Sequence, residues 1–300
     1  MMNKENTNNT RCGYVAILGR PNVGKSTLLN NILQIKLSII TPKPQTTRHR
    51  VLGIYNNDCA QIVFLDTPGI IEPRYKLQEL LVRAAQSAAK EADILLFLIE
   101  ADEALALQDN EIMVELSRYS KPIILCINKI DKVDKRRLLP QIASLSRIEC
   151  IKEIVPASAL KNDGIDVLLR TLIKHLPVSP PLYPADQLTT APERFFVSEI
   201  IREKVFFHYG QEIPYSTTVA IEEFTERTGR KDYIRAAILV ERESQKGILI
   251  GKKGEALKKV GAAARQEIET LLGRPVFLEM VVLVRPNWRQ KEKTLRELGY

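Results

Sequence analysis

The sequence predicts two domains, a doubly wound α/β domain with a mostly parallel sheet and then a smaller α+β domain. In residues 12–176, short apolar stretches alternate with helical patterns, which is typical of parallel strands joined by helices. Four prolines within residues 177–184 exclude a helix or a central strand there. From residue 191 onward the predicted order is helix, strand, strand, short helix, helix, strand. A chain of 300 residues is long enough for both domains.

The composition is that of an ordinary globular protein, with 45% hydrophobic and 27% charged residues. The four cysteines are scattered without a C-x-x-C pair, which favours reduced thiols in a cytosolic protein. No apolar run approaches the about 18 residues that a membrane-spanning helix needs. The polar first eleven residues predict a disordered tail and not a signal peptide. The net charge of +8 permits an anionic partner without proving one.

A phosphate-binding pattern opens the first domain. Residues 19–26 fit G-x-x-x-x-G-K-[ST], and they lie between an apolar run at 14–18 and a helical pattern at 27–33. The glycines let backbone N–H groups surround a phosphate, Lys25 reaches the β and γ phosphates, and the Ser26 hydroxyl ligates Mg²⁺. The alternative is a chance turn in an unrelated α/β protein, which the flanking strand and helix disfavour.

Two further segments could sense the γ-phosphate. The basic loop 35–50 contains two prolines together with Thr46 and Thr47, and in a phosphate-binding switch a threonine there covers Mg²⁺. The alternative is an exposed loop without special chemistry. Farther along, an apolar stretch ends in an Asp-x-x-Gly pattern. Asp66 can hold Mg²⁺ through water, and the Gly69 N–H can approach the γ-phosphate.

A fourth pattern predicts recognition of a nucleotide base. An apolar stretch ends in Asn128-Lys129-Ile130-Asp131, which fits N-K-x-D. The carboxylate of Asp131 can accept hydrogen bonds from the N1–H and N2 amine of guanine. Adenine lacks this donor pair and would leave the carboxylate unpaired, so an ATPase is disfavoured. Asn128 can brace the neighbouring loops, the Lys129 stem can lie over the ring, and the backbone around Ser158 can contact the guanine edge.

The second domain carries a G-x-x-G joint at 251–254, followed by a predicted helix at 255–272. The glycines let an RNA backbone pass close, and Lys252 and Lys253 face its phosphates. A helical corner with packing glycines is the alternative. Residues 246–265 hold six Lys and Arg against one carboxylate, which favours an anionic ligand. The preceding apolar residues are predicted to line a groove for unstacked bases: Ile248, Leu249 and Ile250.

In order, these motifs resemble those of the translation-factor class of P-loop GTPases. The segments GRPNVGKSTLLN and PQTTRHR resemble more closely the bacterial Era GTPases, in which a C-terminal KH domain follows the GTPase domain. The resemblance implies a P-loop GTPase fold and a smaller α+β KH domain of type II. It divides the chain into a disordered tail (1–11), a GTPase domain (12–176), a Pro-rich linker (177–190), a KH domain (191–285) and a basic C-terminal tail (286–300).

The resemblance also implies a function. It predicts a GTP-hydrolysing switch that uses GTP, GDP and Mg²⁺ and binds the 3′ end of small-subunit (16S) ribosomal RNA. Such a protein assists ribosome biogenesis by acting on the 30S subunit. The expected location is the cytoplasm, with peripheral association at the cytoplasmic face of the cell membrane, and the expected state is a monomer. Trp288, in the basic tail, either stacks on a base or anchors the tail, and it is not assigned to the RNA site.

The expected site residues follow from matching the motifs position by position. The catalytic residues are Lys25, Thr47 and Gly69, with Thr47 preferred to Thr46. The nucleotide-binding residues are Gly19, Arg20, Pro21, Asn22, Val23, Gly24, Lys25, Ser26, Thr27, Asp66, Thr67, Pro68, Gly69, Asn128, Lys129, Asp131, Ser158, Ala159 and Leu160. The metal ligands are Ser26, Thr47 and Asp66. The RNA-binding residues are Ile248, Ile250, Gly251, Lys252, Lys253, Gly254 and Lys258.

One departure from Ras-like enzymes concerns the attacking water. Ile70 stands where a Gln would orient it, and neither Ile70 nor Ile71 can hydrogen-bond a water. We therefore expect slow intrinsic hydrolysis that RNA stimulates, with the water positioned by backbone, by another group or by a bound partner. In similar GTPases a residue like Asn22 helps to bind a monovalent cation such as K⁺. A constitutive RNA-binding protein with a structural nucleotide site is the second hypothesis, and a GTPase of tRNA modification, which lacks the G-x-x-G module, is the third.

Overall fold

The computed structural model describes residues 10–102 and 111–300, and these form two compact units. Within the described residues, the first unit comprises 10–38, 47–72 and 81–190. The second unit comprises 39–46, 73–80 and 191–300, so it includes two short segments from early in the chain. Most of the predicted disordered tail lies outside the described residues, but the prediction was wrong for Arg11, which begins the first strand.

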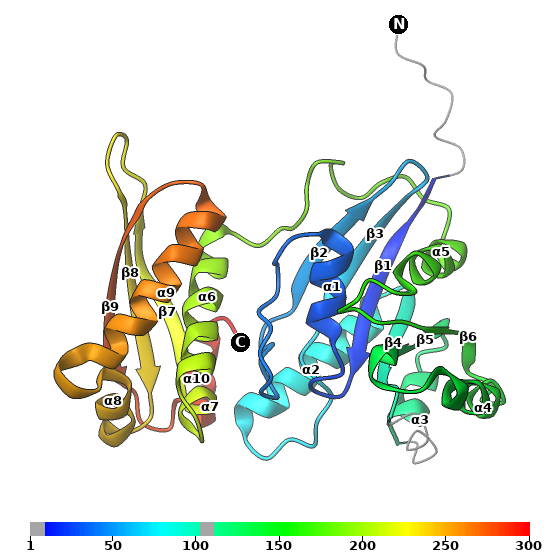
Figure 1. Ribbon diagram of the computed structural model, residues 1–300, viewed down its shortest axis with the longest axis horizontal. Helices are drawn as coiled ribbons and strands as arrows, with labels where there is room; N and C mark the ends of the chain where they lie inside the picture. The colour runs from blue at the N-terminus through cyan, green and yellow to red at the C-terminus, as the bar shows by residue number, and fades with distance from the viewer. Residues whose placement is uncertain (1–9, 103–110) are drawn as a thin grey trace, which may run out of the picture. The chain divides into compact units, whose positions relative to one another are not determined.

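A six-stranded sheet forms the centre of the first unit, in the order β2-β3-β1-β4-β5-β6 (Figure 1). All neighbouring strands are parallel except β2, which pairs antiparallel with β3. The predicted doubly wound, mostly parallel sheet is therefore confirmed. The strands are β1 Arg11–Gly19, β2 Val51–Asn56, β3 Ala60–Asp66, β4 Ile94–Glu100, β5 Ile123–Asn128 and β6 Ile151–Pro156.

Helices connect these strands and cover both faces of the sheet, since every residue of β3 and of β5 is buried. Apolar side chains of α2, such as Ala85 and Ala88, pack with Leu95 and Phe97 of β4 in one core cluster. The helix α4, which contains Pro140, was not predicted. The helices are α1 Lys25–Leu33, α2 Lys76–Glu91, α3 Glu111–Ser117, α4 Lys135–Leu145 and α5 Ile165–His175.

The proline-rich stretch 177–190, which the sequence predicts to be an extended interdomain linker, packs against the first unit. The side-chain oxygen of Gln61 accepts hydrogen bonds from the backbone N–H groups of Leu182 (2.7 Å) and Tyr183 (3.0 Å). Near the end of the stretch, the hydroxyl of Thr189 donates to the carbonyl of Leu52 at 2.6 Å. Backbone groups that a free linker would leave to water are thus satisfied by the sheet.

A three-stranded sheet, β7-β8-β9, forms the second unit together with two long helices on one face (Figure 1). Strand β8 pairs antiparallel with β7 and parallel with β9. The order of the first six long elements matches the sequence prediction. The elements are α6 Glu193–His208, α7 Ile213–Ser216, β7 Thr218–Thr225, β8 Asp232–Val240, α8 Glu243–Ile250, η4 Lys252–Gly254, α9 Glu255–Leu272, β9 Val276–Val284, η5 Trp288–Gln290 and α10 Glu292–Glu297.

The C-terminal residues fold as part of this unit. Trp288 is fully buried, its indole N–H donates to the carbonyl of Ser216 at 2.9 Å, and its ring stacks on that of Tyr300. Arg289 forms an ion pair with Glu241. Of the two roles considered for Trp288, the structure shows the anchor, because a fully buried ring offers no face to a base.

None of the helices in residues 10–102 and 111–300 is long and apolar enough to cross a bilayer. No cluster of three or more His, Cys, Asp or Glu side chains in that part of the chain could by itself hold a metal ion.

Candidate functional site: a guanine-nucleotide site and a basic groove

The phosphate loop joins β1 to α1 and contains a buried lysine. Gly24 caps α1 with φ of 101°, a left-handed conformation that favours glycine, and a Cβ there would lie 2.2 Å from the side-chain nitrogen of Asn128. Lys25 is only 6% exposed, and its ammonium donates to the carbonyls of Gly19 (3.1 Å) and Arg20 (2.8 Å). Burial lowers the pKa of Lys25 to about 8. An anionic phosphate would supply the charge that this site lacks.

A cluster of hydroxyls surrounds one carboxylate at the end of β3. Asp66 is fully buried, and its Oδ2 accepts hydrogen bonds from the hydroxyls of Ser26 (2.9 Å) and Ser38 (2.8 Å). Its Oδ1 is buried without a hydrogen-bond partner among the described residues. Burial raises the pKa of Asp66. Thr47 completes the cluster, with its Oγ1 2.9 Å from the Oγ of Ser26.

This cluster suits Mg²⁺, which prefers carboxylate and hydroxyl oxygens as ligands. The unpaired Oδ1 of Asp66 is the observation that fits a cation, because a buried acceptor without a partner is costly. Ser26, Thr47 and Asp66 would hold the ion. The hydroxyl of Thr46 contacts Thr41 and the carbonyl of Lys43 instead, so the choice of Thr47 stays a prediction that this geometry favours.

Ser38 also belongs to the cluster, although its place there was not predicted from the sequence. It lies between the buried residues Leu37 and Ile39 and is itself 4% exposed. A serine inside an apolar run is the only signal that the sequence offered, and such a signal does not name a partner.

The Asp-x-x-Gly segment is tied to the phosphate loop by its backbone. The N–H of Ile70 donates to the carbonyl of Gly19 at 3.0 Å, and the Thr67 hydroxyl donates to the carbonyl of Ile17 at 2.7 Å. The half-buried Ile70 side chain packs against the apolar cluster of the first unit. It therefore contributes packing at the place where Ras-like enzymes have a water-orienting amide.

The guanine-reading segments meet at Asn128, at the end of β5. Its amide nitrogen donates to the carbonyl of Val23 at 2.8 Å, and its oxygen accepts from the N–H of Ala159 at 2.9 Å. Asp131 accepts from the hydroxyl of Ser158 at 2.5 Å, which leaves its carboxylate oriented by a neighbour. The structure thus brings three separate motifs together around one side chain, as the bracing role predicted for Asn128 requires.

Lys129 and Leu160 flank this part of the site. The ammonium of Lys129 pairs with Glu100 at 2.7 Å, and the Leu160 side chain is 72% exposed. The ion pair holds the tip of the Lys129 side chain, and the contact of its stem with a base stays a prediction.

An open groove in the second unit follows the G-x-x-G loop. Both glycines of the loop have positive φ, at 68° for Gly251 and 78° for Gly254. Lys252, Lys253 and Lys258 form no ion pair with another described residue, so their charges are available to an anionic ligand. The groove is lined by Gly254, Leu257, Lys258, Gly261, Ala262 and Arg265 from the loop and α9, and by Leu278 and Met280 from β9.

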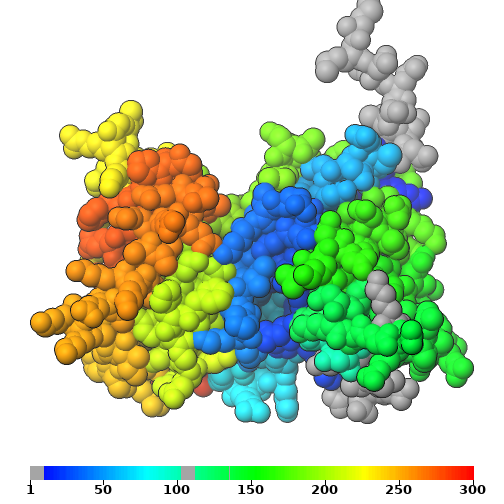
Figure 2. All heavy atoms as spheres, in the orientation of Figure 1, coloured from blue at the N-terminus to red at the C-terminus, as the bar shows by residue number. Residues whose placement is uncertain are grey.

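The structure corrects the residues predicted to line the groove. Leu249 is fully buried in the core of the unit and does not line the groove. Ile250 packs partly against that core, whereas Ile248 is 53% exposed. Figure 2 shows long side chains projecting from the orange stretch that contains α8 and α9. Neither Ile248 nor Ile250 lines the groove, and six of its lining residues were not predicted from the sequence: Leu257, Gly261, Ala262, Arg265, Leu278 and Met280.

The chain matches two known families. The family described as 50S ribosome-binding GTPase matches residues 14–129, and the KH domain family matches residues 212–289. The chain is also similar to GTPase Era of Geotalea uraniireducens, with 50% identity over 97% of this chain and 98% of that protein. GTPase Era of Geobacter metallireducens is 51% identical over the same shares of the two chains. The chain belongs to the Era family of GTPases.

Solved Era structures share the whole fold. Two of them have a TM-score of 0.93 and 46% sequence identity, and each comparison covers 97% of this chain and 99% of the other. One is a variant of Aquifex aeolicus Era bound to GDP·AlF4⁻. The other is Era in complex with MgGDPNP and nucleotides 1506–1542 of 16S ribosomal RNA. The resemblance to Era that the motifs indicated is confirmed, and so is the type of enzyme, a GTPase.

Proposed function

We propose that this chain hydrolyses GTP and, as part of small ribosomal subunit assembly, binds the 3′ end of 16S ribosomal RNA. One observation carries the proposal: a single chain holds a guanine-reading site with a cation-ready carboxylate and a basic groove at a G-x-x-G loop. Support comes from the Era complex that contains both MgGDPNP and a 16S fragment.

In this proposal each element of the first unit has a defined task. The ammonium of Lys25 leaves the carbonyls of Gly19 and Arg20 and pairs with the β and γ phosphates. Mg²⁺, when bound, neutralises phosphate charge. Thr47 and the Gly69 N–H contact the γ-phosphate side of the site, where charge develops during hydrolysis.

The attacking water is not oriented by the side chain at position 70. Ile70 has no polar side-chain atom and packs into the core cluster. Backbone groups or bound RNA orient the water in this proposal, so hydrolysis without RNA is slow. The same observation keeps the second hypothesis, a constitutive RNA-binding protein whose nucleotide is structural. Turnover that rises when RNA is added would contradict that hypothesis.

The proposal includes three finer features of the chain. Asn22, which has φ of 66° within the phosphate loop, helps to bind K⁺, and equal turnover in K⁺ and Na⁺ would contradict this. The chain acts as a monomer in the cytoplasm, which sedimentation velocity tests. Its peripheral contact with the cell membrane rests on the family resemblance alone, and co-sedimentation with vesicles of anionic lipid tests it.

The main experiment measures binding of an RNA with the sequence of nucleotides 1506–1542, without nucleotide, with GDP and with GDPNP, at one salt concentration. We expect the tightest binding with GDPNP. The variant Lys252→Glu/Lys253→Glu should lose at least tenfold in affinity, since each lysine is expected to contact a phosphate. Its matched control is Arg230→Glu/Lys231→Glu in the β7–β8 hairpin, which makes the same change of charge at exposed positions.

Three results would contradict the proposal. Equal binding in all nucleotide states would favour the constitutive RNA-binding protein. Equal binding of an RNA of scrambled sequence would leave the GTPase but exclude the assigned target. Equal loss in the hairpin variant would show that general charge, and not the G-x-x-G loop, determines binding.

A further inference from the structure

The loop between β2 and α1 has its two ends in the candidate metal cluster and its middle in the other unit. The hydroxyl of Ser38 donates to Asp66, and the hydroxyl of Thr47 contacts that of Ser26. The eight residues between them, 39–46, fold with the second unit. This segment therefore connects the residue predicted to cover Mg²⁺ to the helix α6.

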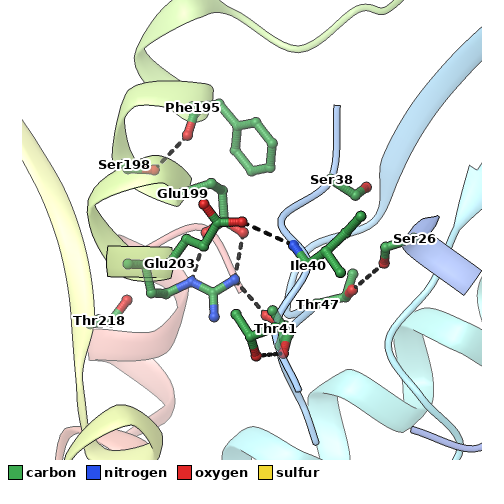
Figure 3. A network of polar contacts seen from close by, with 12 residues as sticks. Ser26, Ser38, Ile40, Thr41, Thr47, Phe195, Ser198, Glu199, Glu203 and Thr218 are labelled. Carbon is green, nitrogen blue, oxygen red and sulfur yellow. Dashed lines mark hydrogen bonds and ion pairs between the residues drawn. The ribbon is translucent and has the colours of Figure 1, made fainter. Parts of the chain in front are cut away.

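Three contacts fasten the segment 39–46 along α6. The N–H of Ile40 donates to the carboxylate of Glu203 at 3.1 Å (Figure 3). The ammonium of Lys43 donates to carbonyls at the end of the helix, those of Phe206 and Tyr209. The guanidinium of Arg202 donates to the carbonyl of Thr46 at 2.6 Å.

The contact from Arg202 differs from the other two because the Arg202 side chain is buried. Arg202 is 1% exposed, its Nε donates to Glu199 at 2.8 Å, and its Cζ lies 5.5 Å from the centre of the Phe206 ring. Its Nη1 is buried without a hydrogen-bond partner among the described residues. A buried ion pair that is incompletely satisfied is weak evidence for stability, since apolar replacements of similar volume are often neutral or better. The pair is better explained by what it holds, which is the Thr46 carbonyl.

Holding that carbonyl constrains the next residue. The peptide group is planar, so the Thr46 carbonyl oxygen shares one plane with the N and Cα atoms of Thr47. Holding the oxygen in one place therefore restricts the positions that the Thr47 Cα can reach. In the structure this leaves the Thr47 hydroxyl 2.9 Å from that of Ser26.

We propose that Arg202, oriented by Glu199, is a positioning residue that orders Thr47 for its contact with Mg²⁺ in the GTP-bound state. The inference rests on the proposed function, because it takes Thr47 as the residue that covers the metal. Arg202 removes conformational freedom of the Thr46–Thr47 peptide before the nucleotide binds. Only the state that uses Thr47 gains from this ordering, so Arg202 favours GTP over GDP.

The test compares the affinities of the full chain for Mg·GDPNP and Mg·GDP. Removing Arg202 alone would take the guanidinium away from the buried Glu199 carboxylate, so the main variant is the double replacement Glu199→Gln/Arg202→Met. A second variant, Arg202→Lys, keeps the charge but cannot hold Glu199 and Thr46 with one planar group. The matched control is Arg194→Met on the same helix, because Arg194 is exposed and its one hydrogen-bond partner among residues 10–102 and 111–300 is the carbonyl of Ile221.

We expect the double variant to bind Mg·GDPNP about tenfold more weakly, since one charge-assisted hydrogen bond is lost, and to bind Mg·GDP within about twofold of the parent chain. Arg202→Lys should fall between the two, and Arg194→Met should match the parent chain. The apparent Mg²⁺ affinity at a fixed GDPNP concentration should fall in parallel.

Two results would overturn the inference. Equal weakening of GDPNP and GDP would assign Arg202 a merely structural role. Unchanged affinity for both nucleotides, with melting temperatures that show folded variants, would show that Thr47 is ordered without it. Thr47→Ala in the parent chain separates these from a failure of the proposed function. If Thr47→Ala leaves GDPNP affinity unchanged, the role given to Thr47 is wrong; if it weakens GDPNP and the Arg202 variants do not, only the inference fails.

Discussion

The nucleotide site and the basic groove are built in opposite ways. In the first, polar side chains are buried and bonded to one another, as Asn128 is to Val23 and Ala159. In the second, Lys252 and Lys258 have no ion-pair partner among the described residues, and the floor is made of glycine, alanine and apolar side chains. A buried, prearranged site selects by the cost of leaving its groups unpaired, whereas an open groove selects by shape and charge.

The largest expected effect comes from breaking the buried site at Asp131. Asp131→Asn should reduce GDP affinity about 10³-fold, because the amide cannot accept both donors of guanine. Affinity for xanthosine diphosphate should rise, since xanthine offers an acceptor to the new amide. Titration with both nucleotides checks this. The control is Asp134→Asn, whose carboxylate caps α4 by accepting from the N–H of Arg136 at 3.0 Å. A loss below tenfold for Asp131→Asn would contradict the selection argument.

Next in size is the effect of the two neighbouring threonines. Thr47→Ala should slow GTP hydrolysis about a hundredfold, which is typical for losing one group that stabilises developing charge. GDP affinity should be unchanged. Thr46→Ala, which removes only contacts to Thr41 and Lys43, should change the rate by a few fold at most. Single-turnover hydrolysis measures both rates, and the reverse order would make Thr46 the metal-facing residue.

RNA binding in the groove should weaken when the shape of the groove changes and its charge does not. A Cβ at Gly261 would lie 2.7 Å from the end of the Met280 side chain, so Gly261→Val should push into the floor of the groove. We expect RNA affinity to fall about tenfold, the loss of one stacked base, with GDP affinity unchanged. Gly247→Ala in α8 is the control, because its Cβ would meet nothing within 4 Å. Equal RNA binding by both variants would remove this surface from the RNA site.

The smallest expected effect concerns two buried carboxylates, those of Asp66 and Asp232. Burial raises the pKa of Asp66, whereas hydrogen bonding to Arg274 holds the pKa of Asp232 below its usual value. A depressed folded-state pKa stabilises the fold fully above the unfolded pKa, and this stabilisation is lost as the pH falls through the folded pKa. Asp232→Asn should therefore lower the melting temperature at pH 7, and the difference should shrink below about pH 4.

The control for this measurement is Glu226→Gln, an exposed carboxylate 3.6 Å from the same guanidinium. It should leave the melting temperature almost unchanged, since exposed ion pairs contribute little. A difference for Asp232→Asn that persists undiminished at low pH would show that packing, and not charge, is what the variant lost.

The sequence predicted the parts of the molecule that depend on neighbouring residues. The phosphate loop, Asn128–Asp131 and the G-x-x-G joint are contiguous, and each lies beside the strand or helix that its mechanism needs. Strand β2 was missed, and so was α4, whose Pro140 removes a backbone donor from a helix interior.

Contacts between distant residues were not predictable in the same way. Ser38 contacts Asp66, Gln61 binds the proline-rich stretch 177–190, and Arg202 contacts a residue 156 positions away. Each is an ordinary polar side chain in the sequence, and only the fold selects its partner. Leu249 was misplaced for the related reason that three successive apolar residues do not show which one faces the core.

The close packing of Gly24 against Asn128 also restricts which substitutions the site can accept. A Cβ at Gly24 would overlap the Asn128 amide, and that amide in turn supports the backbone of both Val23 and Ala159. A single substitution in the phosphate loop or at Asn128 therefore disturbs the other motif as well. A lineage changing its nucleotide preference has easier routes at Asp131, whose side chain contacts only Ser158 among these residues. The contacts thus couple the phosphate loop to the bracing asparagine and leave the residue that selects the base outside that coupling.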